Sequence, residues 1–97
     1  MWRHGDVMIA AAEAIPERAE RLRESVLAYG EITGHSHRIE APEKAELWEF
    51  NGERFLKILD TTRVVHEEHK PITLPSGVYR VWQQREYTPE AIRPVYD

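Results

Sequence analysis

The sequence predicts a mostly β domain, either a small antiparallel barrel or a sandwich, with one short helical segment. Turn signals recur at intervals of roughly 8–14 residues, a spacing typical of such folds. The strongest of them is Asn51-Gly52 between the runs AELWEF and ERFLKIL, because both turn residues tolerate a positive φ and so favour a tight hairpin. A chain of 97 residues has room for one hydrophobic core, so we expect a single β domain over residues 1–97.

The first third of the chain combines one clear strand with one ambiguous segment. The run VMIAAA after the Gly5-Asp6 turn predicts a strand that ends before Pro16. The next segment, PERAERLRESVLAYG, has apolar residues at helical spacing, but its second half, SVLAYGE, also reads as a strand. We expect one or two helical turns over 17–23 and then a strand over 25–31.

From Gly34 onward the pattern is β. Strands are expected at HSHRI, on both sides of the Asn51-Gly52 turn, at TRVVHEE and at VYRVWQQREY, with turns at Lys70-Pro71 and LPSG. The first half of VYRVWQQREY is apolar on both faces, as in a central strand. The tail TPEAIRPVYD contains two prolines, which favours an irregular or edge segment.

The composition excludes several classes of protein. Hydrophobic residues make up 41% and charged residues 31%, with a net charge of −4, which argues against non-specific binding to nucleic acid or to an anionic membrane. Without cysteine there are no disulfides, and any metal must have nitrogen and oxygen ligands. The longest apolar run is too short to span a membrane, and the start MWRHGD lacks the order of a signal peptide. We therefore expect a cytoplasmic protein without a membrane partner.

Four of the five histidines fall in two groups, His35 and His37 in GEITGHSHRIE and His66 and His69 in VVHEEHKP. Side chains two apart on a strand share a face, so the first two imidazoles can reach one cation at about 2.0–2.1 Å. The second pair is three apart and faces one point only if its strand ends in a turn or bulge near Glu68. If the strand stays regular, only His66 joins the site. The pattern predicts a divalent transition metal, Zn or Fe/Mn, held by at least three of these histidines.

The segment GEITGHSHRIE partly resembles the first metal motif of the cupins, in which a glycine precedes an HxH pair and a glutamate follows. LPSGVYRV resembles their later PxG turn. The resemblance implies a double-stranded β barrel with a transition metal in an open site, and His35, His37 and Glu40 as ligands. The glycine and glutamate spacings here are shorter, and the final histidine precedes the PxG turn instead of following it.

A second resemblance spans most of the chain. The ordered set HGDV, GEITGHSHR, VVHEEH, LPSGVYRV and QREY is similar to an uncharacterised family of short bacterial and phage β proteins. This resemblance implies no activity. It supports the strand reading of SVLAYGE and the grouping of the two histidine segments.

The favoured function is a metal-dependent hydrolase acting on a phosphodiester or a related small-molecule or nucleic-acid substrate. A metal held by three histidines keeps a position for water, whose pKa a bound Zn²⁺ lowers to about 7. Glu67 or Glu68 would then be the general base, and Arg85 or Arg38 would neutralise the developing charge. The residues expected to bind substrate are Arg38, Gln83 and Tyr87, although the same strand end also reads as a segment running out into solvent.

Two alternatives stay open. Paired histidines without a metal would suit an RNA-cleaving or RNA-binding protein, through one neutral and one protonated imidazole. A closed shell of four histidines would instead suit a non-catalytic, metal-stabilised dimer. A homodimer is favoured in any case, because a small strand-rich chain leaves sheet edges to cover. His4, beside a turn near the terminus, is expected to be incidental.

Overall fold

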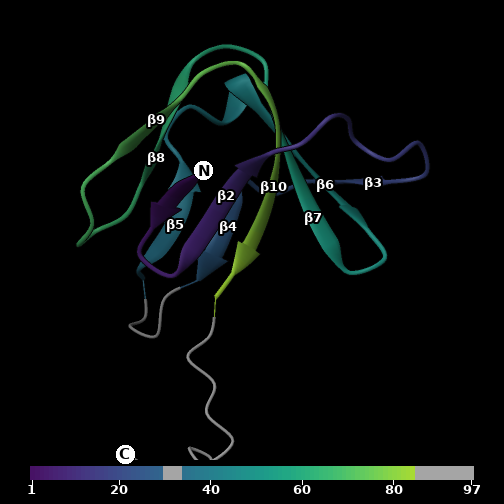
Figure 1. Ribbon diagram of the computed structural model, residues 1–97. Helices are drawn as coiled ribbons and strands as arrows, with labels where there is room; N and C mark the ends of the chain where they lie inside the picture. Colours follow the sequence, from purple (N-terminus) through teal and green to yellow (C-terminus); the bar gives the residue numbers. More distant parts are fainter. Residues whose placement is uncertain (30–33, 85–97) are drawn as a thin grey trace, which may run out of the picture.

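The computed structural model describes residues 1–29 and 34–84. They form two antiparallel sheets, as the sequence predicts, and of the two architectures expected the structure is the sandwich (Figure 1). The six-stranded sheet has the order β1-β2-β10-β7-β6-β3, and the four-stranded sheet has the order β4-β5-β8-β9. The strands are β1 Trp2–His4, β2 Val7–Ala11, β3 Glu20–Leu22, β4 Val26–Tyr29, β5 Ser36–Ile39, β6 Ala45–Phe50, β7 Glu53–Ile58, β8 Thr62–Val65, β9 Ile72–Leu74 and β10 Gly77–Gln83.

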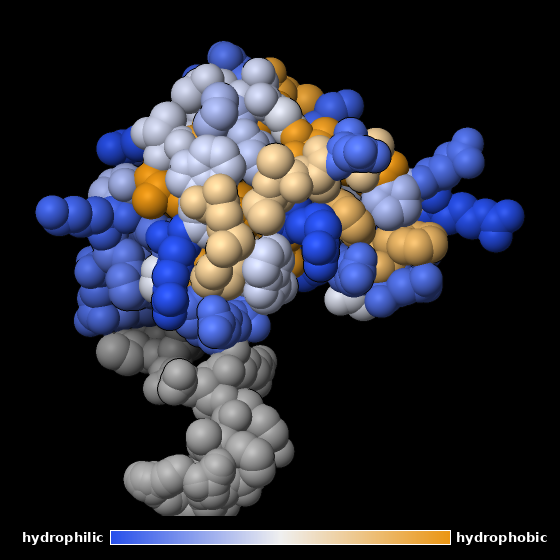
Figure 2. Space-filling model, in the orientation of Figure 1, coloured by the Kyte–Doolittle hydropathy of each residue, from blue (hydrophilic) through white to orange (hydrophobic). Residues whose placement is uncertain are grey.

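The core lies between the two sheets. The six-stranded sheet contributes buried residues such as Ile9 and Leu56, and the four-stranded sheet contributes others such as Leu27 and Val64. In β6, β8 and the middle of β10 these residues alternate with more exposed ones, the period-2 pattern of a sheet with one face inward. Hydrophilic side chains project from the edge of the face seen in Figure 2, and its middle mixes pale, apolar and hydrophilic residues.

The Asn51-Gly52 hairpin is confirmed. Asn51 has φ 51° and Gly52 has φ 81°, and β6 and β7 pair in register on either side, from Phe50 opposite Glu53 to Ala45 opposite Ile58. Two positive φ values in a two-residue loop match the right-handed twist of the flanking strands. β10 lies between β2 and β7, which confirms that it is a central strand.

The helix expected over 17–23 is wrong. Residues 17 and 18 form a turn, in which the Ala19 amide donates to the Pro16 carbonyl at 3.0 Å, and β3 follows. Leu22 stands opposite Leu47 of β6 and packs against the core, so burial in the sheet prevails over weak helical periodicity. The helical segment is instead a 3-10 turn at Pro42–Lys44.

Three further differences concern strands. β1 and β9 were not expected, and β8 ends at Val65, earlier than the run TRVVHEE suggested. β4 lies within the strand expected over 25–31, and the tail beyond residue 84 lies outside the described residues. In the described part of the chain, no helix has the length and apolar character needed to cross a membrane.

Candidate metal centre

All five histidines meet at one end of the sandwich. His4 is the last residue of β1 and His37 lies in β5, while His66 and His69 lie in the connection between β8 and β9. The ring centroids are 4.4 Å apart for His37 and His66, 4.6 Å for His66 and His69, and 4.9 Å for His4 and His37. The fifth ring, that of His35, lies 5.6 Å from His66.

His4 and His37 reach each other from opposite sheets. His4 stands opposite Val7 in the β1–β2 hairpin, and His37 stands opposite Ala28 in the β4–β5 pair. Residues that stand opposite each other on neighbouring strands share a face, and Val7 and Ala28 belong to the core. Both histidines therefore point into the space between the sheets, where they are 2% and 3% exposed.

His66 and His69 both face the cluster because β8 ends early. After Val65, the Glu68 amide donates to His66 Nδ1 at 2.9 Å and closes a turn. The turn removes the strand alternation that would have sent the two imidazoles to opposite faces. The sequence left open whether His66 alone or both His66 and His69 face the site. In the structure both face it.

Within residues 1–29 and 34–84, two groups of side chains have ligand atoms close enough to hold a metal ion. The first is His37, His66 and His69, and the second is His35, His66 and Glu67; within each group the ligand atoms lie within 4.8 Å of one another. His35 and His37 thus fall in different groups, whereas the HxH spacing suggested one shared cation. The groups share His66.

A chain of polar contacts runs through the two buried histidines. His4 Nε2 lies 2.9 Å from the Lys70 carbonyl oxygen, and His4 Nδ1 lies 2.9 Å from His37 Nδ1. At the far end, His37 Nε2 lies 3.4 Å from Asp6 Oδ1. Both ends of this chain are oxygens that only accept, because a carbonyl and an ionised carboxylate carry no proton.

Two neutral imidazoles cannot supply protons to all three contacts, because each carries one N–H. Burial lowers the pKa of His37 to about 4, with the His66 and His4 charges next in importance. Burial also lowers the pKa of His4, against the Lys70 hydrogen bond, which raises it. Both rings are therefore neutral at pH 7, and one of the three contacts has no proton.

The contact without a proton is the one between His37 and Asp6. The Lys70 carbonyl can only accept, so the proton of His4 is on Nε2 and His4 Nδ1 is an acceptor. The hydrogen bond between the two rings then takes its proton from His37, which carries it on Nδ1. His37 Nε2 then presents its lone pair towards a carboxylate oxygen, at the longest of the three distances. Two facing acceptors repel each other unless a cation compensates them. An imidazole whose other nitrogen donates a hydrogen bond is also the usual form of a metal ligand.

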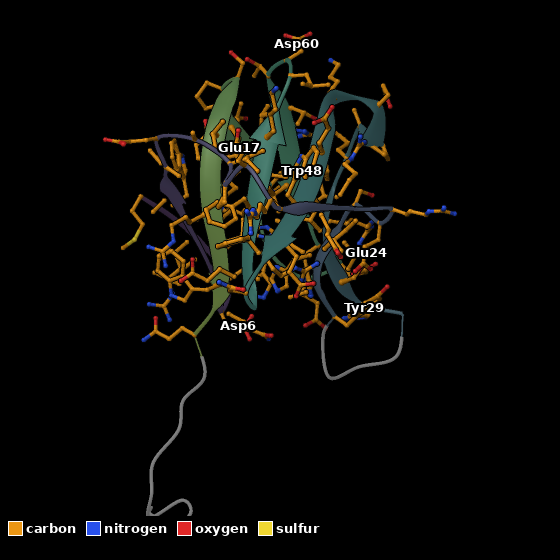
Figure 3. All side chains as sticks on the ribbon, turned by 90° about the vertical axis from the view of Figure 1, so that its right-hand side faces the viewer. Asp6, Glu17, Glu24, Tyr29, Trp48 and Asp60 are labelled. Atoms are coloured by element: carbon orange, nitrogen blue, oxygen red, sulfur yellow. The ribbon has the colours of Figure 1, made fainter. Side chains whose placement is uncertain are left out.

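Asp6 is held in place by the end of β10. Gln83 Nε2 donates to Asp6 Oδ2 at 2.6 Å, and the Gln84 amide donates to the Asp6 carbonyl at 2.8 Å. Asp6 belongs to neither group of candidate ligands, so its carboxylate borders the centre without lying close to all three imidazoles. Figure 3 shows Asp6 at the same end of the sandwich as Tyr29, the last residue of β4.

Gly5 brings the β1–β2 turn against the cluster. Its φ is +65°, and a Cβ at this position would lie 2.8 Å from His37 Cε1 and 2.9 Å from His69 Nε2. Real Cβ atoms do not come this close to their neighbours, and a left-handed φ favours glycine. The turn therefore packs against two of the imidazoles only because it has no side chain there.

The acidic and basic residues expected at the site have other partners. Glu67 accepts from the Ser36 amide at 3.0 Å and from Arg38 at 3.0 Å. These contacts, the Ser36 amide first, lower the pKa of Glu67. Glu68 lies 3.9 Å from His35. Arg38, expected to bind substrate, forms an ion pair with Glu67.

Four other expected residues have different outcomes. Gln83, expected to bind substrate, donates to Asp6, and its role towards a substrate stays a prediction. Glu40, a ligand by the cupin pattern, instead forms an ion pair with Arg63 and belongs to neither candidate group. Arg85 and Tyr87 lie outside the described residues.

The sequence missed His4 and Asp6. His4 is not incidental, because it is buried and bonded to His37. The signal that could have found both is the motif HGD itself, in which a histidine and an aspartate flank a glycine at a two-residue turn. His4 directly precedes the turn and Asp6 lies within it, so a tight turn holds both side chains at the same end of the hairpin.

Comparison with known proteins gives a family without a known function. A family model described as "Domain of unknown function (DUF8820)" matches residues 3–84. No curated protein matches the chain, and no solved structure does. The matched region includes β2 to β10, β1 except for Trp2, and all five histidines, and the chain therefore belongs to the DUF8820 family.

Proposed function

We propose that the protein binds a divalent transition metal ion through His37, His66 and His69 and uses it to hydrolyse a phosphodiester or a related phosphate ester. The observation that carries the proposal is the 3.4 Å contact between His37 Nε2 and Asp6 Oδ1, for which the hydrogen bonds of His4 to Lys70 and to His37 leave no proton. A buried lone pair that faces a carboxylate calls for a positive charge, and the pKa of about 4 means that a proton does not supply it at pH 7. Two further imidazoles lie close enough to share the ion.

Binding requires one local change. The Glu68 N–H donates to His66 Nδ1. His66 must give up this hydrogen bond to become a ligand, because Nδ1 either binds the metal itself or takes the proton when Nε2 binds it. One hydrogen bond contributes about 1 kcal/mol net. A structural Zn²⁺ site contributes roughly 10–16 kcal/mol at neutral pH, so the metal outweighs this cost.

His37, His66 and His69 would hold the ion, and the ion would supply an activated water for hydrolysis. A bound Zn²⁺ lowers the pKa of its water to about 7 and polarises a phosphoryl oxygen. Asp6 is the best-placed proton acceptor, since it faces His37 Nε2 without belonging to the ligand group and is oriented by Gln83. Glu67 is less suited to this role, because its contacts lower its pKa and occupy both carboxylate oxygens.

The metal-free alternative has less support. Acid–base catalysis by two histidines works best when their pKa values lie near the working pH. Burial lowers the pKa of both His4 and His37, so neither would be protonated at pH 7 to serve as the acid.

The test begins with protein purified without an affinity tag, whose metal content is measured by elemental analysis. We expect stoichiometric metal, and a loss of metal affinity by orders of magnitude in His37→Ala and His69→Ala. His35→Ala is the matched control, because His35 lies in the same segment as His37 but outside the three-histidine group. Equal losses in all three variants, or none in His37→Ala, would overturn the site.

The hydrolase part has a separate test. The metal-loaded protein should hydrolyse bis(p-nitrophenyl) phosphate. Asp6→Asn keeps the three imidazoles but removes the negative charge beside His37 Nε2, so it should bind the metal more weakly and, when saturated with metal, lose turnover by about 10²–10⁴-fold. Glu67→Gln is the control for loss of a neighbouring carboxylate. A protein that keeps its metal but shows no turnover would be a metal-stabilised module, and the hydrolase proposal would be wrong.

A further inference from the structure

The outer face of β1, β2 and β10 points away from the core and carries basic and aromatic side chains. Residues of β2 and β10 alternate between the two faces of the six-stranded sheet, and the inward set, such as Ile9 and Val81, belongs to the core. We call the outward set on these three strands the β1–β10 patch. It consists of Arg3, Met8, Ala10, Val78, Arg80 and Trp82.

Strand register places these side chains on one continuous surface. Met8 stands opposite Arg3 on one side and opposite Trp82 on the other, so the three form a row across neighbouring strands. Arg80 lies on the same strand as Trp82, and its guanidinium is 5.4 Å from the centre of the indole ring. Neighbouring strands lie about 4.8 Å apart, so Arg3 is roughly 10 Å from Trp82 and one extended ligand can contact both.

The patch is open to solvent. Arg3 and Arg80 are exposed, and Trp82 is 38% exposed although tryptophan usually buries most of its surface. In Figure 1 this face of β2 and β10 points towards the viewer, with β4 behind, and the connection from β2 to β3 runs away from it towards β6. Met8 is buried but lies outside the core cluster, so it gives the row an apolar centre.

The patch is also positively charged. It contains two arginines and no carboxylate, in a chain whose net charge is −4. Arg3 donates from Nε to the Gly5 carbonyl at 3.0 Å, which leaves four further N–H donors on its guanidinium. Among the hydrogen bonds and ion pairs of residues 1–29 and 34–84, Arg3 has no other and Arg80 has none.

An exposed indole between two arginines favours one class of ligand. Bases stack on aromatic side chains, and guanidinium groups pair with phosphate. A single-stranded nucleic acid supplies both groups along one extended chain. An acidic peptide offers carboxylates to the arginines but no base, and a duplex offers phosphates but keeps its bases paired.

The patch ends at the metal centre. Arg3 donates to the carbonyl of Gly5, the residue that packs against imidazoles of the cluster. Across the patch, Trp82 directly precedes Gln83, which donates to Asp6. A phosphodiester chain on the patch therefore leads to the carboxylate that we propose as proton acceptor.

We infer that the β1–β10 patch binds single-stranded nucleic acid, with one base stacked on Trp82 and phosphates at Arg3 and Arg80. That the bound strand is also the substrate rests on the proposed function, since its phosphodiester would be hydrolysed where the patch meets the metal centre. That the strand binds here does not rest on it.

The experiment titrates a fluorescein-labelled oligothymidylate of about 12 nucleotides with the full-length protein as purified, and follows fluorescence anisotropy at several salt concentrations. Each phosphate contact contributes about −0.7 to the slope of log affinity against log salt for a single strand. Two contacts should give a slope of about −1.4, and Arg3→Gln and Arg80→Gln should each reduce it to about −0.7.

Trp82→Ala should lower the affinity about tenfold and leave the salt slope unchanged, because stacking is not a charge contact. Trp82→Phe should restore most of the affinity, since it keeps an aromatic ring. Arg23→Gln is the matched charge control, because Arg23 directly follows β3, at the opposite edge of the six-stranded sheet from β1. The Tm of each variant reports that it is folded.

Three results would overturn the inference. The first is the absence of binding at sub-millimolar protein concentration. The second is equally tight binding of a duplex of the same length or of polyglutamate, which would make the patch a general anion surface. The third is an unchanged salt slope in both arginine variants or an unchanged affinity in Trp82→Ala.

Elemental analysis of the same preparation, and electrophoresis of the probe after the titration, separate this inference from the proposed function. If the protein holds stoichiometric metal but does not bind the oligonucleotide, the inference about the patch is wrong and the metal centre stands. If the oligonucleotide binds but no metal is held, the proposed function is wrong and the patch stands. If both bind and the probe stays intact, the bound strand is not the substrate.

Discussion

His37 depends on residues that lie far from it in the sequence. The spacing of the histidine segments predicted His35, His37, His66 and His69 as candidates, because strand alternation is a local property. The proton arrangement of His37 is set instead by His4 and by Asp6. These contacts depend on how two sheets pack, so no local pattern reveals them.

Removal of His4 should weaken metal binding without removing a ligand. His4 accepts the proton of His37 Nδ1 and thereby keeps the lone pair on Nε2. In His4→Ala we expect metal affinity to fall about 10–100-fold, as for other hydrogen-bond partners of ligating histidines. Competition with a chromophoric chelator measures this. A loss as large as that of His37→Ala would mean that His4 is itself a ligand.

The metal-free protein should lose stability as the pH falls from about 6.5 to about 4. The pKa of His37 is about 4 in the folded state and 6.5 in the unfolded chain, so between these values the unfolded state binds more protons. The free energy of unfolding then rises with pH across this window, by up to about 1.4 kcal/mol per pH unit for one group. His4 acts in the same direction, since its pKa is also lowered.

Urea titrations at several pH values test this dependence. His37→Gln should flatten the slope between pH 6.5 and 4, because the variant has no imidazole to protonate at that position. Glu40 and Glu67 have lowered pKa values and contribute at lower pH, as carboxylates take up protons. A slope that is unchanged in His37→Gln would show that other groups cause it.

At the scale of elements, turn chemistry was a better guide than helical periodicity. The Asn51-Gly52 turn predicted β6 and β7 because its backbone geometry is a property of the two residues themselves. The segment over 17–23 has apolar residues at helical spacing, but Leu22 gains more from the sheet by standing opposite Leu47. The sequence left open whether β8 ends early or continues as a regular strand through His69. The tertiary fold decides this, and β8 ends at Val65.

The β1–β2 turn gives a prediction with a matched control. Gly5→Ala should reduce both stability and metal affinity, because the new Cβ would meet His37 and His69 at under 3 Å. Gly52→Ala has a similar left-handed φ of +81° but nothing within 4 Å of its Cβ. Both variants should lose about 1–2 kcal/mol from backbone strain, and only Gly5→Ala should also lose metal affinity.

Chemical denaturation and metal titration of the two glycine variants provide the measurement. Equal metal affinity in both would show that the turn does not press on the ligands. If Gly5→Ala has a normal metal affinity but a lower free energy of unfolding, the loss of stability comes from backbone strain alone and not from contact with the imidazoles.

At the scale of the whole molecule, the homodimer stays a prediction, and it depends on whether the open edges of the two sheets pair with a second copy. The edge strands are β1 and β3 in one sheet and β4 and β9 in the other. Three of these are three residues long and β4 is four, and short edges leave little backbone for pairing. Light scattering decides the question: a mass near 11.4 kDa at micromolar concentration would contradict the dimer.

The metal should also stabilise the whole sandwich. The candidate ligands come from β5 and from the β8–β9 connection, and His4 links them to β1 across the space between the sheets. A ligand that binds only the folded state adds RT ln(1 + [L]/Kd), which is about 2.7 kcal/mol at a free metal concentration of 100 times the Kd. For a domain of this size, each kcal/mol moves the Tm by about 4–8 °C. Calorimetry should therefore show that a chelator lowers the Tm by roughly 10–20 °C, while the Tm of His37→Ala should not respond to metal or chelator. A chelator shift of the same size in His37→Ala would place the stabilising ion elsewhere in the molecule.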